Sequence, residues 1–220
     1  MAETAAVPRL ALALDVAEPD EALALAAELA PWFPIAKVGL ELFCRAGPVV
    51  VEQLASLDLA VFLDLKLHDI PTTCRRAAAA LARLPLSYLT AHASGGETML
   101  AAVVDGLAPS PALVLGVTVL TSEPAAPGVV AARARAAAAA GCAGVVCAAG
   151  ELAEVAQAAP GLLRVVPGLR PARAPSQDQL RVATPAEAAA GGADVLVVGR
   201  AVTGAADRRA AAAELAASLL

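Results

Sequence analysis

The sequence predicts a single α/β domain over residues 1–220, folded as a (β/α)8 TIM barrel. Eight short apolar segments alternate with eight segments that have the residue spacing of helices. No linker rich in Pro, Gly or Ser divides the chain, and 220 residues is an ordinary length for one barrel. Polar residues gather directly after the apolar segments, which is where barrels of this kind carry their chemistry.

The apolar segments are expected to be strands because they are short and bounded by turn-forming or charged residues. The last of them, Val195-Leu196-Val197-Val198, is apolar throughout, as a strand buried on both faces should be. The expected strands are 10–14, 35–39, 60–65, 88–91, 112–119, 144–147, 163–166 and 195–198.

The segments between them are expected to be helices, including the alanine-rich ones, because Leu, Val, Arg and Glu recur in them at helical intervals. One helix should begin at Pro19-Asp20-Glu21, and Thr184-Pro185-Ala186-Glu187 has the spacing of a capping box. Gly141 and Gly191-Gly192 are typical helix ends. The expected helices are 20–30, 48–57, 73–84, 96–107, 127–140, 151–158, 184–190 and 207–220.

The alternative fold is an open doubly wound sheet. It would normally place a glycine-rich dinucleotide loop after the first strand. Leu14-Asp15-Val16-Ala17-Glu18 stands there instead, which favours the closed barrel.

Composition narrows the class of function. The formal net charge is −5 and aromatic residues make up 2% of the chain, so a basic surface for nucleic acid is not expected. None of the four cysteines forms a C-x-x-C pair, and reduced thiols in a cytoplasmic protein are expected. The N-terminal residues resemble neither a secretory signal nor a membrane span.

The most informative segment is Asp64-Leu65-Lys66-Leu67-His68-Asp69, which follows an apolar run. Only 17% of the chain is charged, so a cluster of charges at the mouth of a buried strand needs a reason. Residues two apart on a strand project to one face, so Asp64 and Lys66 should enter the barrel mouth together. Lys37, late in the neighbouring strand, can bridge to Asp64, and opposite charges at ~4 Å are worth about 4 kcal/mol at a dielectric of about 20.

Further polar residues follow other strands. Asp15 ends the first strand, and Thr121 follows the fifth. Gly199-Arg200 leaves the eighth strand, where a glycine backbone can approach a phosphate and an arginine can bind it in a bidentate way. The loop after the seventh strand supplies Arg170 and Gln179 to the same predicted anion site.

These motifs resemble those of the orotidine 5′-phosphate decarboxylase family. The resemblance is most specific in Asp64-x-Lys66-x-x-Asp69-Ile70-Pro71-x-Thr73, and it spans nearly the whole chain. The other matching motifs are Leu14-Asp15, Lys37-Val38-Gly39, Thr90-Ala91-His92-Ala93-Ser94, Val117-Thr118-Val119-Leu120-Thr121-Ser122, Val166-Pro167-Gly168-Leu169-Arg170-Pro171, Asp178-Gln179 and Val198-Gly199-Arg200.

The resemblance implies removal of CO2 from orotidine 5′-monophosphate to give UMP, without a cofactor or metal, in pyrimidine biosynthesis. It implies that Asp64 faces the substrate carboxylate and that Lys66 protonates C6. Lys37 would hold Asp64 and the ribose, and Asp15 would bind ribose hydroxyls.

The resemblance also implies a homodimer with shared sites, in which Asp69, Ile70 and Thr73 reach the partner's site. Thr121 would contact the pyrimidine ring. Arg170, Gln179, Gly199 and Arg200 would hold the phosphate, and Pro167 would lie at the substrate site. Two departures are the threonine at Thr72, where asparagine is frequent in the family, and the unusual segment 172–176.

Two other functions stay open at this point. One is a Mg²⁺-dependent sugar-phosphate decarboxylase or aldolase of the same barrel group, for which Glu41 is a possible extra ligand. The other is a nucleotide-binding barrel without catalysis. Ile70-Pro71-x-Thr73 after the second aspartate disfavours the first, and the intact set of charged residues disfavours the second.

Overall fold

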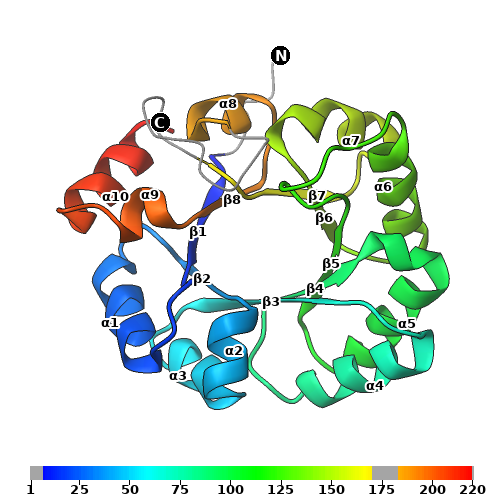
Figure 1. Ribbon diagram of the computed structural model, residues 1–220, viewed down its shortest axis with the longest axis horizontal. Helices are drawn as coiled ribbons and strands as arrows, with labels where there is room; N and C mark the ends of the chain where they lie inside the picture. Colours follow the sequence, from blue (N-terminus) through cyan, green and yellow to red (C-terminus); the bar gives the residue numbers. More distant parts are fainter. Residues whose placement is uncertain (1–6, 170–182, 220) are drawn as a thin grey trace.

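The computed structural model describes residues 7–169 and 183–219, and their eight strands form a closed barrel. Each strand pairs in parallel with the next in chain order, and β8 pairs with β1 to complete the ring. Helices surround this ring on the outside (Figure 1). The predicted (β/α)8 barrel is therefore confirmed, and the open doubly wound sheet is excluded.

The strands lie where the apolar segments predict them, with small differences at their ends. The third strand continues two residues further than expected, and the fifth is shorter at both ends. The strands are β1 (Arg9–Ala13), β2 (Ile35–Val38), β3 (Ala60–Leu67), β4 (Tyr88–His92), β5 (Leu113–Val117), β6 (Gly144–Val146), β7 (Leu163–Val166) and β8 (Val195–Val198).

Each predicted helical segment contains a helix. Two short α-helices were not predicted: α2 lies directly after β2, and α9 lies directly after β8. The helices are α1 (Pro19–Leu29), α2 (Leu40–Ala46), α3 (Val49–Ala55), α4 (Pro71–Leu81), α5 (Gly96–Leu107), α6 (Val129–Ala139), α7 (Leu152–Ala158), α8 (Pro185–Ala190), α9 (Arg200–Thr203) and α10 (Arg208–Ala217), with 3-10 turns η1 (Ala93–Gly95) and η2 (Ala149–Glu151).

The predicted helix boundaries hold where a specific interaction defines them. Thr184 and Glu187 form the capping box of α8, with the Thr184 hydroxyl accepting from the Glu187 amide at 3.2 Å. Gly141 and Gly192 follow α6 and α8 with positive φ angles, a conformation that glycine adopts without steric cost. No helix of residues 7–169 and 183–219 has the length and apolar character that crossing a membrane requires.

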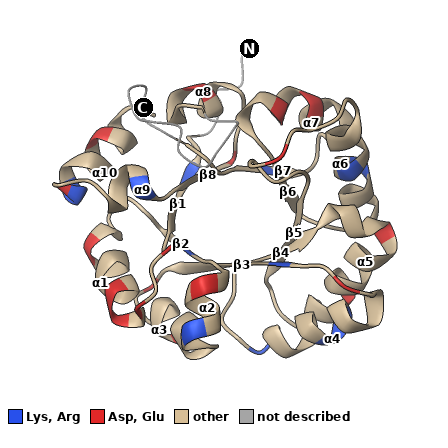
Figure 2. Cartoon of the chain, viewed as in Figure 1, with Lys and Arg blue, Asp and Glu red and all other residues tan. Residues whose placement is uncertain are grey.

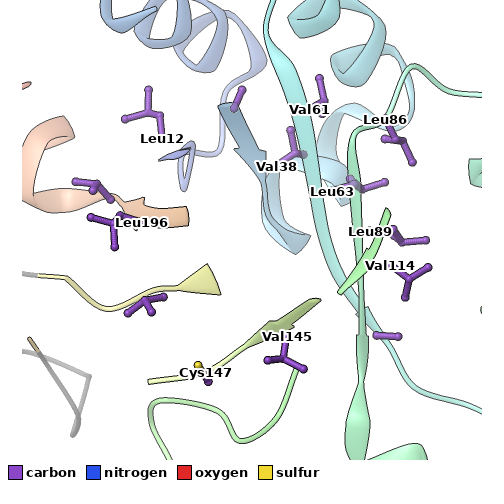
Figure 3. Close-up of a cluster of buried hydrophobic side chains, with 14 of the residues drawn as sticks. Leu12, Val38, Val61, Leu63, Leu86, Leu89, Val114, Val145, Cys147 and Leu196 are labelled. Carbon is purple, nitrogen blue, oxygen red and sulfur yellow. The ribbon is translucent and has the colours of Figure 1, made fainter. Parts of the chain in front are cut away.

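Alternation along the strands separates two apolar layers. One set of side chains points to the barrel axis and forms an interior cluster of Ala11, Ala13, Ile35, Phe62, Tyr88, Leu115, Val165, Val195 and Val197. The other set points outward and packs under the helices; Figure 3 shows part of it, including Leu12, Val61, Leu89 and Val145. The interior cluster fills the barrel up to the pocket, and its members Ala13, Phe62 and Val197 also line the pocket.

Helices α4 and α5 pack closely because Gly106 of α5 has no side chain. A Cβ at this position would clash with the carbonyl oxygen of Arg75 and lie 2.9 Å from the Cβ of Ala78. We expect Gly106→Ala to lower the free energy of unfolding by about 1–3 kcal/mol, the usual cost of overpacking. Urea denaturation measures this change. Gly161→Ala is the matched control because a Cβ there would meet no atom within 4 Å; equal losses in the two variants would contradict the packing argument.

Candidate active site

A pocket of about 300 Å³ opens at the carboxyl ends of the strands. Its floor is apolar and comes partly from the interior cluster, and its walls carry charged and hydroxyl side chains. Lining residues are Ala13, Asp15, Lys37, Phe62, Asp64, Lys66, Val117, Val119, Leu120, Thr121, Ser122, Val146, Cys147, Pro167, Gly168, Val197, Gly199 and Arg200. In Figure 2 the charged residues of the described chain are spread over the outer helices, and the ring of strands is largely tan.

Four charged side chains form an alternating chain across the pocket. The Lys37 ammonium lies 3.0 Å from Asp15 Oδ1 and 3.7 Å from Asp64 Oδ2. The Lys66 ammonium lies 2.7 Å from the same Asp64 oxygen. We call Asp15, Lys37, Asp64 and Lys66 the charge array. Each lysine in it is adjacent to at least one carboxylate, so positive and negative groups alternate along the array.

Asp64 is the central carboxylate of the array. Burial alone would raise its pKa, since only 13% of its side chain is exposed. The charges of Lys37 and Lys66, together with hydrogen bonds from Lys66 and Thr90, outweigh burial and hold the pKa of Asp64 below its usual value. Asp64 therefore stays ionised in a site that is otherwise largely apolar.

The strand geometry at Lys66 differs from the regular alternation that the sequence suggests. Leu63 pairs with Leu89, and Leu67 pairs with Ala91, so three residues of β3 stand opposite the single residue Thr90. Lys66 adopts a φ of 52°, which is unusual for a residue with a side chain. Lys66 and Asp64 do meet in the pocket, but through an irregular strand rather than a simple two-residue repeat.

The sequence carries a further signal for this site in its use of lysine. The chain has 16 basic residues, and only Lys37 and Lys66 among them are lysines. Both line the pocket. Lysine differs from arginine in having a compact ammonium group that can give up a proton. The use of lysine only at this pocket therefore indicates a role that needs this property.

The other predicted binding residues line the part of the pocket that β5, β7 and β8 provide. Gly199 and Arg200 line it after β8, and Pro167 and Thr121 line it after β7 and β5. A Cβ on Gly199 would lie 3.4 Å from the Cβ of Ala13 and 3.9 Å from Asp15 Oδ2, so Gly199 adjoins the charge array. Arg170 and Gln179 lie outside the described residues.

Asp69, Ile70 and Thr73 are not among the described residues that line this pocket. They form the loop after β3 and the first turn of α4, and all three are exposed. Asp69 Oδ1 accepts a hydrogen bond of 2.6 Å from the Ile70 amide, which fixes the carboxylate in the loop. Ile70 is 66% exposed, a large value for an isoleucine.

Glu41, the possible extra metal ligand, lies exposed in the first turn of α2 and does not line the pocket. Over residues 7–169 and 183–219, no three His, Cys, Asp or Glu side chains are grouped closely enough to hold a metal ion. The two carboxylates of the pocket, Asp15 and Asp64, each contact the ammonium group of Lys37.

The fold and this pocket define a (β/α)8-barrel enzyme with lysine and aspartate side chains at its carboxyl mouth. The comparisons with known proteins identify it further. The chain belongs to the orotidine 5′-phosphate decarboxylase / HUMPS family, whose model matches residues 8–215.

Relatives cover nearly the whole chain. An orotidine 5′-phosphate decarboxylase of Anaeromyxobacter sp. (strain K) is 48% identical over 223 residues, which cover 96% of this chain and 98% of the relative. One of Halorhodospira halophila is 46% identical, with 96% of each chain covered. The crystal structure of the Lactobacillus acidophilus orotidine 5′-phosphate decarboxylase superposes with a TM-score of 0.82 at 32% identity, over 96% of this chain and 99% of that one.

Proposed function

We propose that the pocket removes CO2 from orotidine 5′-phosphate to give UMP, with the charge array performing the reaction and Lys66 acting as the acid. The chain is an orotidine 5′-phosphate decarboxylase, a carboxy-lyase of pyrimidine biosynthesis. The observation that carries the assignment of roles is the contact of Asp64 with both lysines inside the pocket. The four cysteines, which all lie in the described part of the chain, form no disulfide, and this fits the proposed cytoplasmic location.

The first step proposed is the placing of the substrate carboxylate next to Asp64. Asp64 is ionised, and Lys37 and Lys66 hold it in position, so it cannot turn away from an incoming negative group. Binding energy from the rest of the substrate must offset this repulsion. Loss of CO2 removes the substrate's negative carboxylate and relieves the repulsion, so the contact favours the transition state over the bound substrate.

The second step is stabilisation and protonation of C6. When the bond between C6 and the carboxylate carbon breaks, its electron pair remains on C6 and neutral CO2 leaves. A carbanion at this ring position has no adjacent group to delocalise the charge, so a preorganised cation is needed. The Lys66 ammonium is that cation, and it then donates its proton to C6, leaving a neutral amine that solvent reprotonates.

The remaining residues are assigned to binding. Asp15 and Lys37 lie beside Gly39, and a Cβ on Gly39 would come within 3.3 Å of the Asp15 carboxylate. The glycine therefore leaves room for ribose hydroxyls against these two charges. Thr121 is assigned to the pyrimidine ring and Pro167 to the same side of the pocket. Gly199 and Arg200, with Arg170 and Gln179, are assigned to the phosphate.

We also propose a homodimer in which Asp69, Ile70 and Thr73 complete the site of the partner. Two observations support this proposal. The three residues do not line the pocket of their own chain among the described residues, yet they follow Asp64 and Lys66 closely in the sequence. A second exposed apolar side chain, Leu40 (54% exposed), follows the neighbouring strand β2. Ile70 and Leu40 give this end of the barrel an apolar surface of the kind that association covers.

The test is the loss of orotidine 5′-phosphate followed by its ultraviolet absorbance, with and without EDTA. We expect UMP formation at the same rate in both conditions. Activity that EDTA abolishes and Mg²⁺ restores would favour the metal-dependent members of the barrel group. Tight UMP binding without any turnover would favour the non-catalytic alternative.

A further inference from the structure

Thr90 lies directly below the charge array and has no accessible surface. It stands two residues after Tyr88 on β4, so its side chain points to the barrel axis like that of Tyr88 in the interior cluster. Thr90 is not among the described residues that line the pocket. Any effect of Thr90 on the reaction must therefore act through the groups that it contacts.

The Thr90 hydroxyl makes two hydrogen bonds, both to the array-bearing segment of β3. It donates to Asp64 Oδ1 at 2.9 Å, and it accepts from the Lys66 backbone amide at 2.9 Å. One hydroxyl has one proton to donate and lone pairs to accept with, so the two bonds use it in complementary ways. Thr90 is thus joined to both catalytic residues of the motif.

The hydrogen bond to the Lys66 amide lies where β3 is irregular. Three residues of β3 stand opposite Thr90 alone, so the regular ladder of backbone bonds is interrupted there. Lys66 also has a positive φ, a conformation that costs about 1 kcal/mol or more for a residue with a Cβ. The Thr90 hydroxyl satisfies the amide that this backbone turn directs toward β4, and so stabilises the turn.

The bond to Asp64 fixes the orientation of its carboxylate. Lys37 and Lys66 both contact Oδ2, and Thr90 contacts Oδ1. With partners on both oxygens, the carboxylate plane cannot rotate without breaking at least one contact. The direction in which Asp64 faces the pocket therefore depends on Thr90 as well as on the lysines.

We propose that Thr90 is a positioning residue for decarboxylation, because its single hydroxyl sets both the orientation of Asp64 and the backbone turn that carries Lys66. This inference rests on the roles proposed above for Asp64 and Lys66. A threonine that only satisfied its own hydrogen-bonding groups would matter for folding and not for turnover.

The test is Thr90→Val, which keeps the shape of the side chain and removes both hydrogen bonds. We expect kcat to fall about 10- to 100-fold, the factor that corresponds to losing a hydrogen bond to a charged group. KM and the affinity for UMP should change little because Thr90 does not line the pocket. Retention of more than half of the wild-type kcat in a folded Thr90→Val protein would overturn the proposal.

Thr118→Val is the matched control. Thr118 is also buried, and its hydroxyl donates to the Val146 carbonyl at 2.9 Å, an oxygen that the Thr118 amide also reaches. Its removal should cost stability without lowering kcat. Equal losses of kcat in the two variants would assign the effect at Thr90 to general disturbance of the barrel, and would overturn the proposal.

Thr90→Ser and Thr90→Ala differ only by the hydroxyl oxygen and give the same comparison if the valine variant does not fold. Serine should restore most of the activity that alanine loses, and equal loss in both variants would contradict a role of the hydroxyl. A second readout is the pH profile of kcat/KM. The Thr90 hydrogen bond contributes to the lowered pKa of Asp64, so its removal should move the acidic limb to higher pH.

Lysine labelling separates this inference from the proposed function. Because the chain has two lysines, [13C]lysine gives two side-chain NMR signals, which Lys66→Ala assigns. Thr90→Val should shift the Lys66 signal more than the Lys37 signal. An unshifted Lys66 signal overturns the positioning role, whereas failure of the wild-type protein to form UMP overturns the assigned roles in catalysis.

Discussion

Lys66→Ala is expected to reduce kcat/KM by ~10⁵-fold or more while the protein remains folded. The variant loses a general acid, typically worth about 10²–10⁴-fold, and a preorganised charge that is worth about 10²–10³-fold. Folding should survive because Asp64 keeps Lys37 at 3.7 Å and the hydrogen bond from Thr90. Alanine also places no new demand on the backbone, since lysine already occupies the positive φ at this position.

The measurement is ultraviolet turnover, together with thermal unfolding followed by circular dichroism. Lys66→Arg separates the two contributions, since it keeps the positive charge but cannot readily release a proton. It should stay well below wild type. Arg135→Ala removes a positive charge from the exposed face of α6 and should keep activity within about twofold. Substantial turnover by Lys66→Ala would remove Lys66 from the role of acid.

The barrel could be predicted from the sequence because each level of evidence indicates the same structure. The eighth strand is apolar throughout, α8 begins at a capping box, and polar residues follow the strands. The prediction could bring Lys37, Asp64 and Lys66 together and place Asp15 on the same rim, because the carboxyl ends of all eight parallel strands meet at one mouth of a barrel. The contact between Asp15 and Lys37 was not predicted.

The irregular part of β3 could not be predicted. The number of β3 residues that stand opposite one residue of β4 depends on pairing between positions 24 apart in the sequence, which local patterns do not encode. Thr90 was inconspicuous for the same reason. Threonine is common in strands, and only the register shows that its hydroxyl meets Asp64 and Lys66.

The two short helices escaped prediction for a different reason. α9 has four residues, too few for a helical period to stand out in the sequence. α2 has seven residues and is one of two helices between β2 and β3, where a barrel pattern of alternating strands and helices predicts a single helix. α2 ends at Ala46 and is capped by Gly47, which has a φ of 66° and lies two residues before the start of α3 at Val49. Both short helices follow strands that carry site residues, Lys37 on β2 and Gly199 after β8.

Mixing two inactive variants, Lys66→Ala and Asp69→Ala, is expected to restore activity if sites are shared between subunits. Asp69 does not line its own pocket among the described residues, so a catalytic contribution from it requires a second chain. In a hybrid dimer, one site takes both substitutions and the other takes neither. With equal amounts and random exchange, about a quarter of all sites should be wild type, and activity should recover to about that fraction.

Lys66→Ala mixed with Asp64→Ala is the matched control for this experiment. Both residues line the pocket of their own chain and contact each other at 2.7 Å, so every site in a hybrid keeps one of the two lesions. No recovery is expected in that mixture. Native mass spectrometry must show that hybrids form in both mixtures. If Asp69 belongs to the partner's site, one site of each such hybrid combines an intact Lys66 with an intact Asp69 and must be active. Hybrid formation without recovery in the Lys66→Ala and Asp69→Ala mixture would therefore place Asp69 outside the partner's site.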